Sequence, residues 1–451
     1  MIDAPRAAAL ETLGAVREKG AYANLVLPGL LRERRISGRD AAFATELAYG
    51  TCRAQGLLDE VIASASGRAV DAIDPPVLDA LRLGTYQLLR TRVGDHAAVS
   101  TTVDAVKSGP SKGAAGFANA VLRRIARDDA DTWVARVAPA ASDDLIGHLA
   151  MQYAHPRWIA EAFWDSLQRN GIRSMGQLQR LLAEDDARPD VHLVARPGAI
   201  TAEELALVTG GEEGRFSPYA VYLPGGDPGA LDVVRDGLAG VQDEGSQLVA
   251  RALAVAPLES DGGRWLDLCA GPGGKAALLG ALAAVDGAAV DAVEPSVHRA
   301  ELVRKAVSGQ PVTVHAVDGR ASGLEPGYDR VLVDAPCSGI GALRRRPEAR
   351  WRKKPADIAD LVLLQHELIS AAADLARPGG VVLYSTCSPH VAETVDVVDA
   401  VAADGRLEPV DTRPLVPSTV LSPLPENGTH VQLWPHLHGT DAMFLQAFRR
   451  V

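Results

Sequence analysis

The spacing of apolar residues changes along this chain of 451 residues. Up to about residue 130, apolar residues recur at steps of three and four, as in AAALETLGAV, FATELAYGTC and VLDALRLGTYQLL, and no run alternates at a period of two. Such spacing places apolar side chains on one face of a helix. The pattern therefore predicts an all-α region over residues 1–135.

From about residue 236 short apolar runs alternate with helical segments. Strands are predicted at RWLDLC, AAVDAVE, VTVHAVD, DRVLVDA and GGVVLYST. This rhythm is typical of a doubly wound parallel sheet, so we expect an α/β domain over residues 236–451. Residues 136–235 begin helical, contain a strand candidate at VHLVA and end near the Gly/Pro/Asp-rich LPGGDPGALD. They predict an α+β linker or recognition subdomain.

The amino-acid composition indicates the cellular compartment of the protein and predicts that its cysteines are not paired in disulfides. The chain has four cysteines, none in a CxxC pair, which favours a reducing cytosol over a disulfide framework. Its first twenty residues interleave acids and bases, unlike a secretory leader. No stretch reaches the roughly 18 uncharged apolar residues of a membrane helix. We expect a soluble cytoplasmic protein.

Charge is distributed unevenly within the net value of −11. The run RRRPEARWRKK (344–354) carries seven bases, one Glu and Trp351 inside an otherwise acidic part of the chain. A solvated helix face is the alternative interpretation. Its place directly after the VLVDAPCSG motif favours contact with nucleic acid, because local field decides where a polyanion docks. A further candidate for RNA contact is the basic edge of the N-terminal region (Lys107, Lys112, Arg123, Arg124, Arg127). The segment His155-Pro156-Arg157-Trp158 could add stacking, but a core position is the favoured interpretation of its tryptophan.

A glycine-rich turn, CAGPGGK (269–275), stands where the first predicted α/β strand meets its helix. Glycines let the backbone approach a ligand closely, and the helix N-terminus offers free N–H groups. Ala276 after Lys275 and the glycine spacing exclude a phosphate-binding loop and a dinucleotide fingerprint. We expect a small polar-headed cofactor, with Glu294 at the next strand end for ribose hydroxyls and Asp318 at the third for an adenine amino group.

Two cysteines occupy similar settings, Cys337 in VLVDAPCSG and Cys387 in VVLYSTCSP. If their strands are parallel neighbours, both thiols share one cleft with Asp334. A thiolate is a nucleophile. Two thiols, a carboxyl group and a methyl-donor pocket suit methylation of carbon 5 of a pyrimidine: a thiolate adds to ring carbon 6, a carboxyl group hydrogen-bonds or protonates ring N3, and a second thiol assists release. The residues leave open which thiol attacks. For Cys52 and Cys269 a buried apolar role is favoured.

CAGPGGK, DAPCSG with RRRPEARWR, and YSTCS together resemble the motifs of the bacterial RNA (cytosine-5)-methyltransferases that use S-adenosylmethionine. GVQDEGSQLVA (240–250) and WPHLHGTDAMFLQAFRR (434–450) resemble that family's flanking segments. The N-terminal helical region, PRAAALETL through FANAVLRRIAR, is similar to the NusB-type RNA-binding domain. The combination resembles the Sun/Fmu type (RsmB-like), which acts on 16S ribosomal RNA of the small subunit, over nearly the whole chain.

The resemblance implies a NusB-like domain (1–135), an RNA-recognition subdomain (136–235) and a Rossmann-like catalytic domain (236–451). It implies that Cys387 is the nucleophile, that Cys337 assists release of the methylated base and that Lys275 projects toward the reacting centre. After YSTCS this chain keeps only Glu393 of the family's Pro-Glu-Glu-Asn stretch, and no role is assigned there. The residues implied to line the cofactor and target pocket are Cys269, Ala270, Gly271, Pro272, Gly273, Gly274, Lys275, Glu294, Asp318 and Asp334.

The substrate that follows from this chemistry is a loop, an unfolded RNA segment or a flipped base, because a stacked cytosine hides its face. We expect a monomer that meets 16S rRNA naked or in a partly assembled subunit, and no metal, since the histidines lack ligand spacing. Two other classes remain open. A DNA cytosine-5 methyltransferase is disfavoured by the second cysteine, and a non-enzymatic RNA-binding factor by the intact thiols and cofactor turn.

Overall fold

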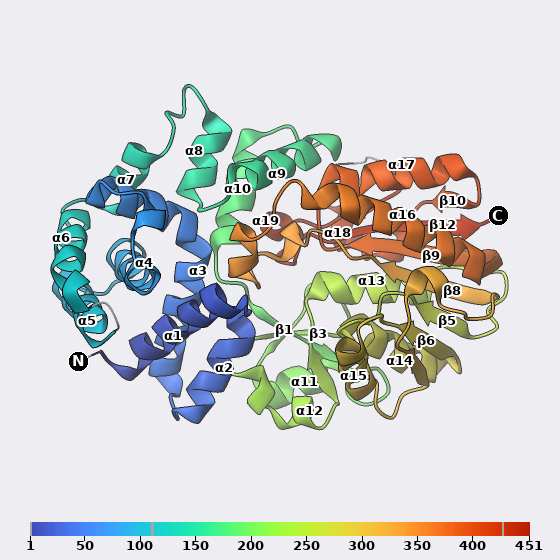
Figure 1. Ribbon diagram of the computed structural model, residues 1–451. Helices are drawn as coiled ribbons and strands as arrows, with labels where there is room; N and C mark the ends of the chain where they lie inside the picture. Colours follow the sequence, from blue (N-terminus) through green and yellow to red (C-terminus); the bar gives the residue numbers. More distant parts are fainter. Residues whose placement is uncertain (1, 110–111, 426–427) are drawn as a thin grey trace. The chain divides into compact units, whose positions relative to one another are not determined.

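The computed structural model describes residues 2–109, 112–425 and 428–451 (Figure 1). Residues 110–111 and the Lys112 side chain, part of the predicted basic edge, lie outside this description. The chain forms two compact units. The first comprises Met1–Glu161, Leu178–Arg188 and Leu343–Lys353, and the second comprises Ala162–Gln177, Pro189–Ala342 and Lys354–Val451. The predicted boundaries near residues 135 and 235 follow secondary structure rather than contacts and stay a prediction.

The N-terminal region is helical throughout its described length, as predicted. Apolar residues at helical spacing form its core, for example Leu47, Leu58 and Val61 of the long third helix, all fully buried. Asp3 begins the first helix by accepting a hydrogen bond from the Arg6 backbone, and Gly20 ends it in the left-handed conformation. The helices are α1 (Ala4–Lys19), α2 (Ala23–Glu33), α3 (Gly38–Ser66), α4 (Pro75–Arg90), α5 (Asp95–Ser108), α6 (Ala115–Ile125), α7 (Ala130–Val137) and α8 (Leu145–Gln152), followed by α9 (Arg157–Arg169) and α10 (Met175–Asp186).

Part of the basic run 344–354 is buried: Arg344 and Arg350 have almost no exposed surface, whereas Arg346 and Lys354 are exposed. The predicted contact with RNA is therefore wrong for Arg350 and stays a prediction for the exposed bases. Arg350 is fully buried, pairs with Asp185 at 2.8 Å and donates to the Ala154 carbonyl at 2.8 Å. The indole of Trp351 donates to the carbonyl oxygens of Cys52 and Arg53 at 3.0 and 3.1 Å. These side chains are occupied by protein partners, because a buried cation needs a counter-charge and a buried N–H needs an acceptor.

The same buried network contains His155, which was a candidate for stacking on RNA. Its Nε2 lies 2.9 Å from Asp185 Oδ2, and its side chain is fully buried. Burial, with the Arg350 charge, lowers the pKa of His155. His155 is therefore a neutral partner of the Asp185 carboxylate rather than a platform for a base.

The second unit contains a small antiparallel sheet of order β2-β3-β1-β4. Its strand β1 (Val191–Ala195) is the predicted VHLVA strand. The buried face of this sheet packs Leu193 and Val221 against Leu205 of α11 (Ala202–Thr209). The other elements are β2 (Glu212–Glu213), β3 (Ala220–Leu223), α12 (Asp232–Arg235) and β4 (Ala239–Val241).

The main sheet has the order β10-β12-β9-β8-β5-β6-β7, with β11 paired to β12. The five predicted strands are all present and pair in parallel: β5 (Arg264–Asp267), β6 (Ala289–Val293), β7 (Val312–His315), β8 (Tyr328–Asp334) and β9 (Ala376–Thr386). The expectation of an entirely parallel sheet is wrong at one edge. There β12 (Phe444–Arg450) runs antiparallel to both β9 and β10 (Leu407–Val410), and β11 is Val431–Gln432. Side-chain alternation predicts a strand but not its direction.

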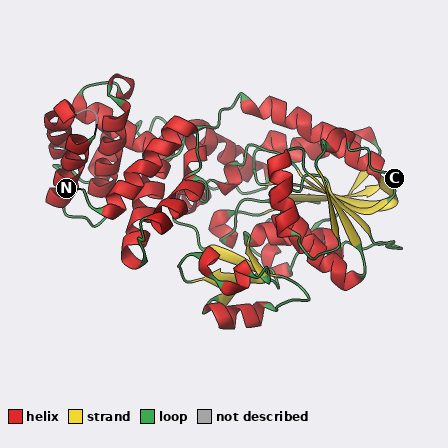
Figure 2. Cartoon of the chain, turned by 60° about the horizontal axis from the view of Figure 1, so that its bottom comes forward, coloured by secondary structure: helices red, strands yellow, loops and turns green. Residues whose placement is uncertain are grey.

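Helices cover both faces of this sheet (Figure 2). Alternate residues of β9 point to opposite sides: Val381 and Leu383 pack with α13 (Glu244–Val255) and α14 (Gly274–Asp286), whereas Val382 and Tyr384 pack with α16 (Asp357–Leu375) and α17 (Val395–Asp404). The remaining helices are α15 (Val297–Ala306), α18 (Ser418–Leu421) and α19 (Pro435–His438). Within the ranges that the structure describes, no helix is long and apolar enough to cross a membrane.

Candidate active site at the carboxyl ends of the parallel strands

The order of the main sheet reverses between β5 and β8. From β5 the chain proceeds outward through β6 and β7, and then places β8 on the other side of β5. Ligands of such sheets bind outside the carboxyl ends of the strands at this switch point. The ends of these strands carry the predicted site residues Glu294, Asp334 and Cys387, which therefore gather where the topology expects a ligand. Asp267, at the end of β5, lies among them.

The turn between β5 and α14 is shaped by glycine. Gly273 has a φ of 111°, and a Cβ there would lie 2.8 Å from the Ala306 Cβ. A Cβ on Gly271 would lie 1.9 Å from Glu294 Oε2, so only glycine lets this carboxylate approach the turn. With Gly273 at its N-cap, α14 has no side-chain cap, and its first-turn N–H groups stay available to a ligand.

Glu294 is nearly fully buried beside this turn. Its Oε1 accepts a hydrogen bond from the Ser296 backbone at 2.9 Å, and its Oε2 lies 3.4 Å from Arg299 Nη2. Arg299 also donates to the Gly271 carbonyl at 2.6 Å. The carboxylate is thus fixed at the end of β6, where hydroxyl groups of a ligand can donate to it.

Asp267 is a further buried carboxylate at this site that the sequence interpretation did not single out. Its Oδ1 accepts from the Cys269 backbone at 3.3 Å, and its buried Oδ2 has no hydrogen-bond partner. Burial and the nearby Asp334 carboxylate raise the pKa of Asp267 to about 7. An uncapped helix, a close-approach turn and an unpartnered buried oxygen together fit a small ligand with polar hydrogens.

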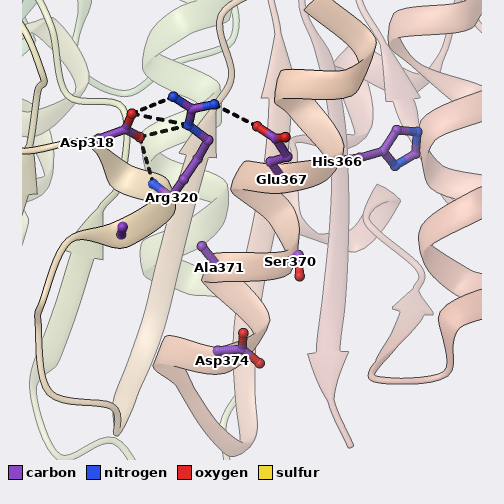
Figure 3. Close-up of a pocket in the computed structure, with 8 residues that line it drawn as sticks. Asp318, Arg320, His366, Glu367, Ser370, Ala371 and Asp374 are labelled. Atoms are coloured by element: carbon purple, nitrogen blue, oxygen red, sulfur yellow. Dashed lines mark hydrogen bonds and ion pairs between the residues drawn. The ribbon is translucent and has the colours of Figure 1, made fainter.

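Asp318 has a different environment from the other predicted cofactor residues. Arg320 occupies its carboxylate through the backbone N–H, Nε and Nη2, and lowers its pKa. Arg320 also bridges to Glu367 of α16 at 2.8 Å (Figure 3). These residues line an open cavity of about 650 Å³, and His366 points away from the ion-paired group. Asp318 is therefore held by Arg320 at the side of this cavity that α16 also lines.

The two thiols share one site, as predicted. The strands β8 and β9 are parallel neighbours, and Cys337 Sγ lies 3.5 Å from Cys387 Sγ. The Cys337 thiol stabilises the Cys387 thiolate by hydrogen bonding, with help from the Lys275 charge, and lowers the pKa of Cys387. The reciprocal interaction, together with burial, raises the pKa of Cys337 well above its ordinary value. The two thiols are therefore electrostatically unequal, and the thiolate form is more favoured at Cys387 than at Cys337.

Lys275 and Asp334 complete the polar surroundings of the thiols. Lys275 Nζ lies 2.8 Å from Asp334 Oδ2, and Ser385 Oγ donates to the other carboxylate oxygen at 3.4 Å. Burial disfavours the lysine charge, but attraction to Asp334 outweighs it and raises the pKa of Lys275. The site therefore holds a buried cation that pairs with Asp334 and favours the thiolate form of Cys387.

Of the other two cysteines, Cys52 is buried, as predicted, whereas Cys269 is half-buried against the core of the main sheet. Burial raises the pKa of Cys52 to about 12, and burial followed by the Asp267 charge raises the pKa of Cys269 well above its ordinary value. Both thiols are therefore poor nucleophiles. Cys269 contributes its backbone to the turn rather than its sulfur to the chemistry.

Glu393, to which the sequence interpretation gave no role, is fully buried and accepts hydrogen bonds from Ser338 and Ser388. Each serine directly follows one of the two cysteines. This shared Cys-Ser order was visible in the sequence and is the signal that would have pointed to a common partner.

Comparisons with known proteins agree with this geometry. The chain matches the family model described as 16S rRNA methyltransferase RsmB/F over residues 252–449 and the NusB family model over residues 3–127. It is 62% identical over 450 residues to a putative methyltransferase of Mycobacterium tuberculosis strain H37Rv, covering 100% of this chain and 97% of that protein.

More distant similarity also extends over the full length. A probable ribosomal RNA small subunit methyltransferase B of Bacillus subtilis is 30% identical over 454 residues, covering 98% of each chain. Among solved structures, the crystal structure of PH0851 matches with a TM-score of 0.80 at 21% identity, covering 100% of this chain and 99% of that one. The fold of the present chain thus has an experimental counterpart.

Proposed function

We propose, from the premise that this chain belongs to the 16S rRNA methyltransferase RsmB/F family, that it methylates carbon 5 of a cytosine in 16S rRNA through a covalent adduct of Cys387. Methyltransferases of this family depend on S-adenosylmethionine. The finer parts of the proposal are the atom that is methylated, the cysteine adduct and the residues that perform each step.

The observation that carries the proposal is the unequal thiol pair. Cys387 Sγ lies 3.5 Å from Cys337 Sγ, and the pKa of Cys387 is lowered while that of Cys337 is raised. Simple methyl transfer to a good nucleophile needs no thiol. Carbon 5 of cytosine is a poor nucleophile, so its methylation does need one, and the thiolate form is favoured at Cys387.

The Cys387 thiolate adds to carbon 6 of the cytosine, and the ring electron pair moves to make carbon 5 nucleophilic. Carbon 5 then takes the methyl group that the cofactor supplies. The carbon 5 proton then passes to water, with Cys337 as base or relay, and its bonding pair re-forms the ring double bond. The Sγ–carbon 6 bond breaks and its electron pair returns to the Cys387 sulfur, which restores the aromatic ring and the thiolate. Cys337, in contact with Cys387, is the group placed to assist this release.

Asp334 and Lys275 are proposed to act on the polar edge of the base. In its protonated form the Asp334 carboxyl group donates a hydrogen bond or its proton to ring N3, which stabilises the charge that develops when the thiolate adds, and it takes the proton back when the ring is restored. Lys275, 2.8 Å away, holds that carboxylate and supplies a positive charge beside Cys387. Removing water from such a site strengthens both interactions.

The cofactor is proposed to lie against the turn 269–275, with Glu294 accepting from its ribose hydroxyls and Asp318 and Asp334 completing the pocket. Three observations support this placement: the uncapped N-terminus of α14, the closeness of Gly271 to Glu294, and the unpartnered Asp267 Oδ2. These residues fit a ligand that carries an ammonium group and hydroxyls. Because Arg320 occupies Asp318, a direct hydrogen bond from Asp318 to adenine has less support than the role of Glu294.

The N-terminal helical region is proposed to bind the RNA, and the target cytosine to be presented unstacked in a loop or a partly assembled small subunit. The match to the NusB family over residues 3–127 supports an RNA-binding role for this region. A base must leave its stack before a thiol can reach carbon 6. Monomeric function is part of the same proposal.

One assay tests the proposal against its rivals. The purified chain is incubated with methyl-labelled S-adenosylmethionine and unmethylated 16S rRNA, duplex DNA or no substrate. We expect label on the rRNA alone, as 5-methylcytosine in the digested nucleosides. Label on DNA would support a DNA methyltransferase, and RNA affinity without label would support a binding factor. Bisulfite sequencing of rRNA from cells with and without the protein then locates the cytosine.

A further inference from the structure

The two cysteine loops meet at one buried carboxylate. Glu393, in the short helical turn Val391–Glu393, is fully buried and has a hydrogen-bond donor at both oxygens. Its Oε1 accepts from the Ser338 backbone at 2.7 Å. Its Oε2 accepts from the hydroxyls of both Ser338 and Ser388. The two hydroxyl oxygens are themselves 3.0 Å apart.

We propose that Glu393 is a positioning residue that sets the relation between the two thiols through Ser338 and Ser388. These three residues are here called the serine latch. Ser338 directly follows Cys337 and Ser388 directly follows Cys387, so each latch serine fixes the backbone that carries one thiol. The inference rests on the proposed function, in which both thiols act on one base.

Neighbouring contacts make the latch rigid. The Nε2 of Gln365 in α16 donates two hydrogen bonds, one to Glu393 Oε1 at 3.3 Å and one to the Pro336 carbonyl at 2.9 Å. Pro336 directly precedes Cys337. The Tyr384 hydroxyl donates to the Glu393 carbonyl at 2.7 Å. Backbone bonds from Ala335 to Ser385 and from Gly341 to Cys387 tie the loops on either side of the thiols. The Glu393 carboxylate fixes the loop segments between these backbone bonds, and those segments carry the two cysteines.

The contacts of Glu393 indicate a positioning role rather than a catalytic one. Its carboxylate oxygens are engaged by serine and glutamine donors, and the reacting groups Lys275 and Asp334 pair with each other instead. Hydrogen bonds to a charged group are stronger than neutral ones, and a latch of this kind loses all of them together when the carboxylate is removed. We therefore expect Glu393 to control thiol geometry without touching the substrate.

The test uses a thiol reaction that needs no RNA. Oxidised glutathione converts the Cys337 and Cys387 thiols into one disulfide and is itself reduced to two glutathione thiols, so electrons and protons balance. Peptide mass spectrometry in defined glutathione buffers measures the equilibrium ratio of the disulfide form to the dithiol form. This ratio gives the effective concentration of one cysteine thiol at the other. We expect Glu393→Ala to lower this value about tenfold or more relative to the unsubstituted chain.

A matched control is Glu244→Gln. Glu244 is also fully buried and accepts from two backbone N–H groups and the Tyr222 hydroxyl, but it lies with the small sheet. This variant should lose stability without changing the thiol equilibrium. Ser388→Ala removes a single latch hydroxyl and should give a smaller decrease, about threefold; it also carries the test if Glu393→Ala does not fold.

The outcomes are distinguishable. A thiol equilibrium that is unchanged in both latch variants, or that falls equally in Glu244→Gln, would overturn the latch, whether or not the chain methylates RNA. If RNA methylation is observed, the latch further predicts a lower kcat for Ser388→Ala at unchanged S-adenosylmethionine affinity. A loss of cofactor affinity instead would mean that the residues act on folding of the whole site.

Discussion

Lys275 Nζ lies 2.8 Å from Asp334 Oδ2, so the lysine of the glycine-rich turn on β5 and the carboxylate that ends β8 form an ion pair across the switch point of the sheet. The lysine side chain is only 11% exposed, and attraction to Asp334 raises its pKa despite burial. Its charge also favours the Cys387 thiolate. This one pair joins the proposed cofactor turn to the proposed nucleophile.

Lys275→Met should lower the rate of labelled methyl transfer by at least about a hundredfold, because Asp334 loses the partner that holds it in place and the Cys387 thiolate loses a stabilising charge. Lys305→Met is the matched control, since Lys305 is an exposed lysine of α15. The rate of methyl transfer by this variant should be close to that of the unsubstituted chain. Steady-state kinetics at saturating S-adenosylmethionine measure both. Equal rates for the two variants would remove Lys275 from the mechanism.

The thiols should differ in their pH dependence. Alkylation by iodoacetamide, followed residue by residue with mass spectrometry, should be faster at Cys387 than at Cys337 near pH 7.5. The alkylation midpoint for Cys387 should lie below that of an ordinary thiol, because its pKa is lowered by the Cys337 hydrogen bond and the Lys275 charge. Cys337→Ala removes the hydrogen-bond donor and should move that midpoint upward. Faster alkylation of Cys337 would reverse the proposed assignment.

Asp267 should make stability depend on pH. Its folded-state pKa of about 7 lies above the unfolded value of about 3.9, so its stabilising contribution is complete below pH 4 and is lost as pH rises through 7. The Asp267→Asn side chain cannot ionise. Between pH 4 and pH 8, the free energy of unfolding of this variant should therefore rise by up to about 4 kcal/mol relative to that of the unsubstituted chain. Urea unfolding at both pH values measures this. A difference that does not vary with pH would contradict it.

The buried part of the basic run should matter for folding rather than for RNA contact. Arg350→Met leaves Asp185 buried without its cation and should cost about 3–5 kcal/mol of unfolding free energy. Lys354→Met changes an exposed base of the same run and should cost under about 0.5 kcal/mol. Chemical denaturation compares them. Weaker RNA binding by Arg350→Met at unchanged stability would restore the original interpretation.

The sequence predicted the elements that periodicity and motif spacing control. The helical first region, the five parallel strands and the meeting of Cys337 with Cys387 are confirmed because apolar spacing determines which face is buried and parallel strands end at one edge. The antiparallel β10 and β12 were not foreseen, since strand direction depends on connections that alternation does not encode.

The sequence did not predict partners that are distant along the chain. The bases at 344–354 read as an exposed patch, but the counter-charge of Arg350 is Asp185, 165 residues earlier. Composition reports charge and not burial. Similarly, Glu393 looked like the remnant of a lost stretch until Ser338, 55 residues earlier, was found to donate to it.

The most direct test of the central claim is a comparison of Cys337→Ala and Cys387→Ala after incubation with 16S rRNA and S-adenosylmethionine. Denaturing gel electrophoresis measures the covalent protein–RNA adduct. Because Cys337 is proposed to assist release and Cys387 to form the bond, Cys337→Ala should accumulate an adduct that ribonuclease digestion removes, and Cys387→Ala should form none. An adduct from Cys387→Ala alone would exchange the two roles, and methylation by Cys387→Ala at the normal rate would contradict the covalent mechanism.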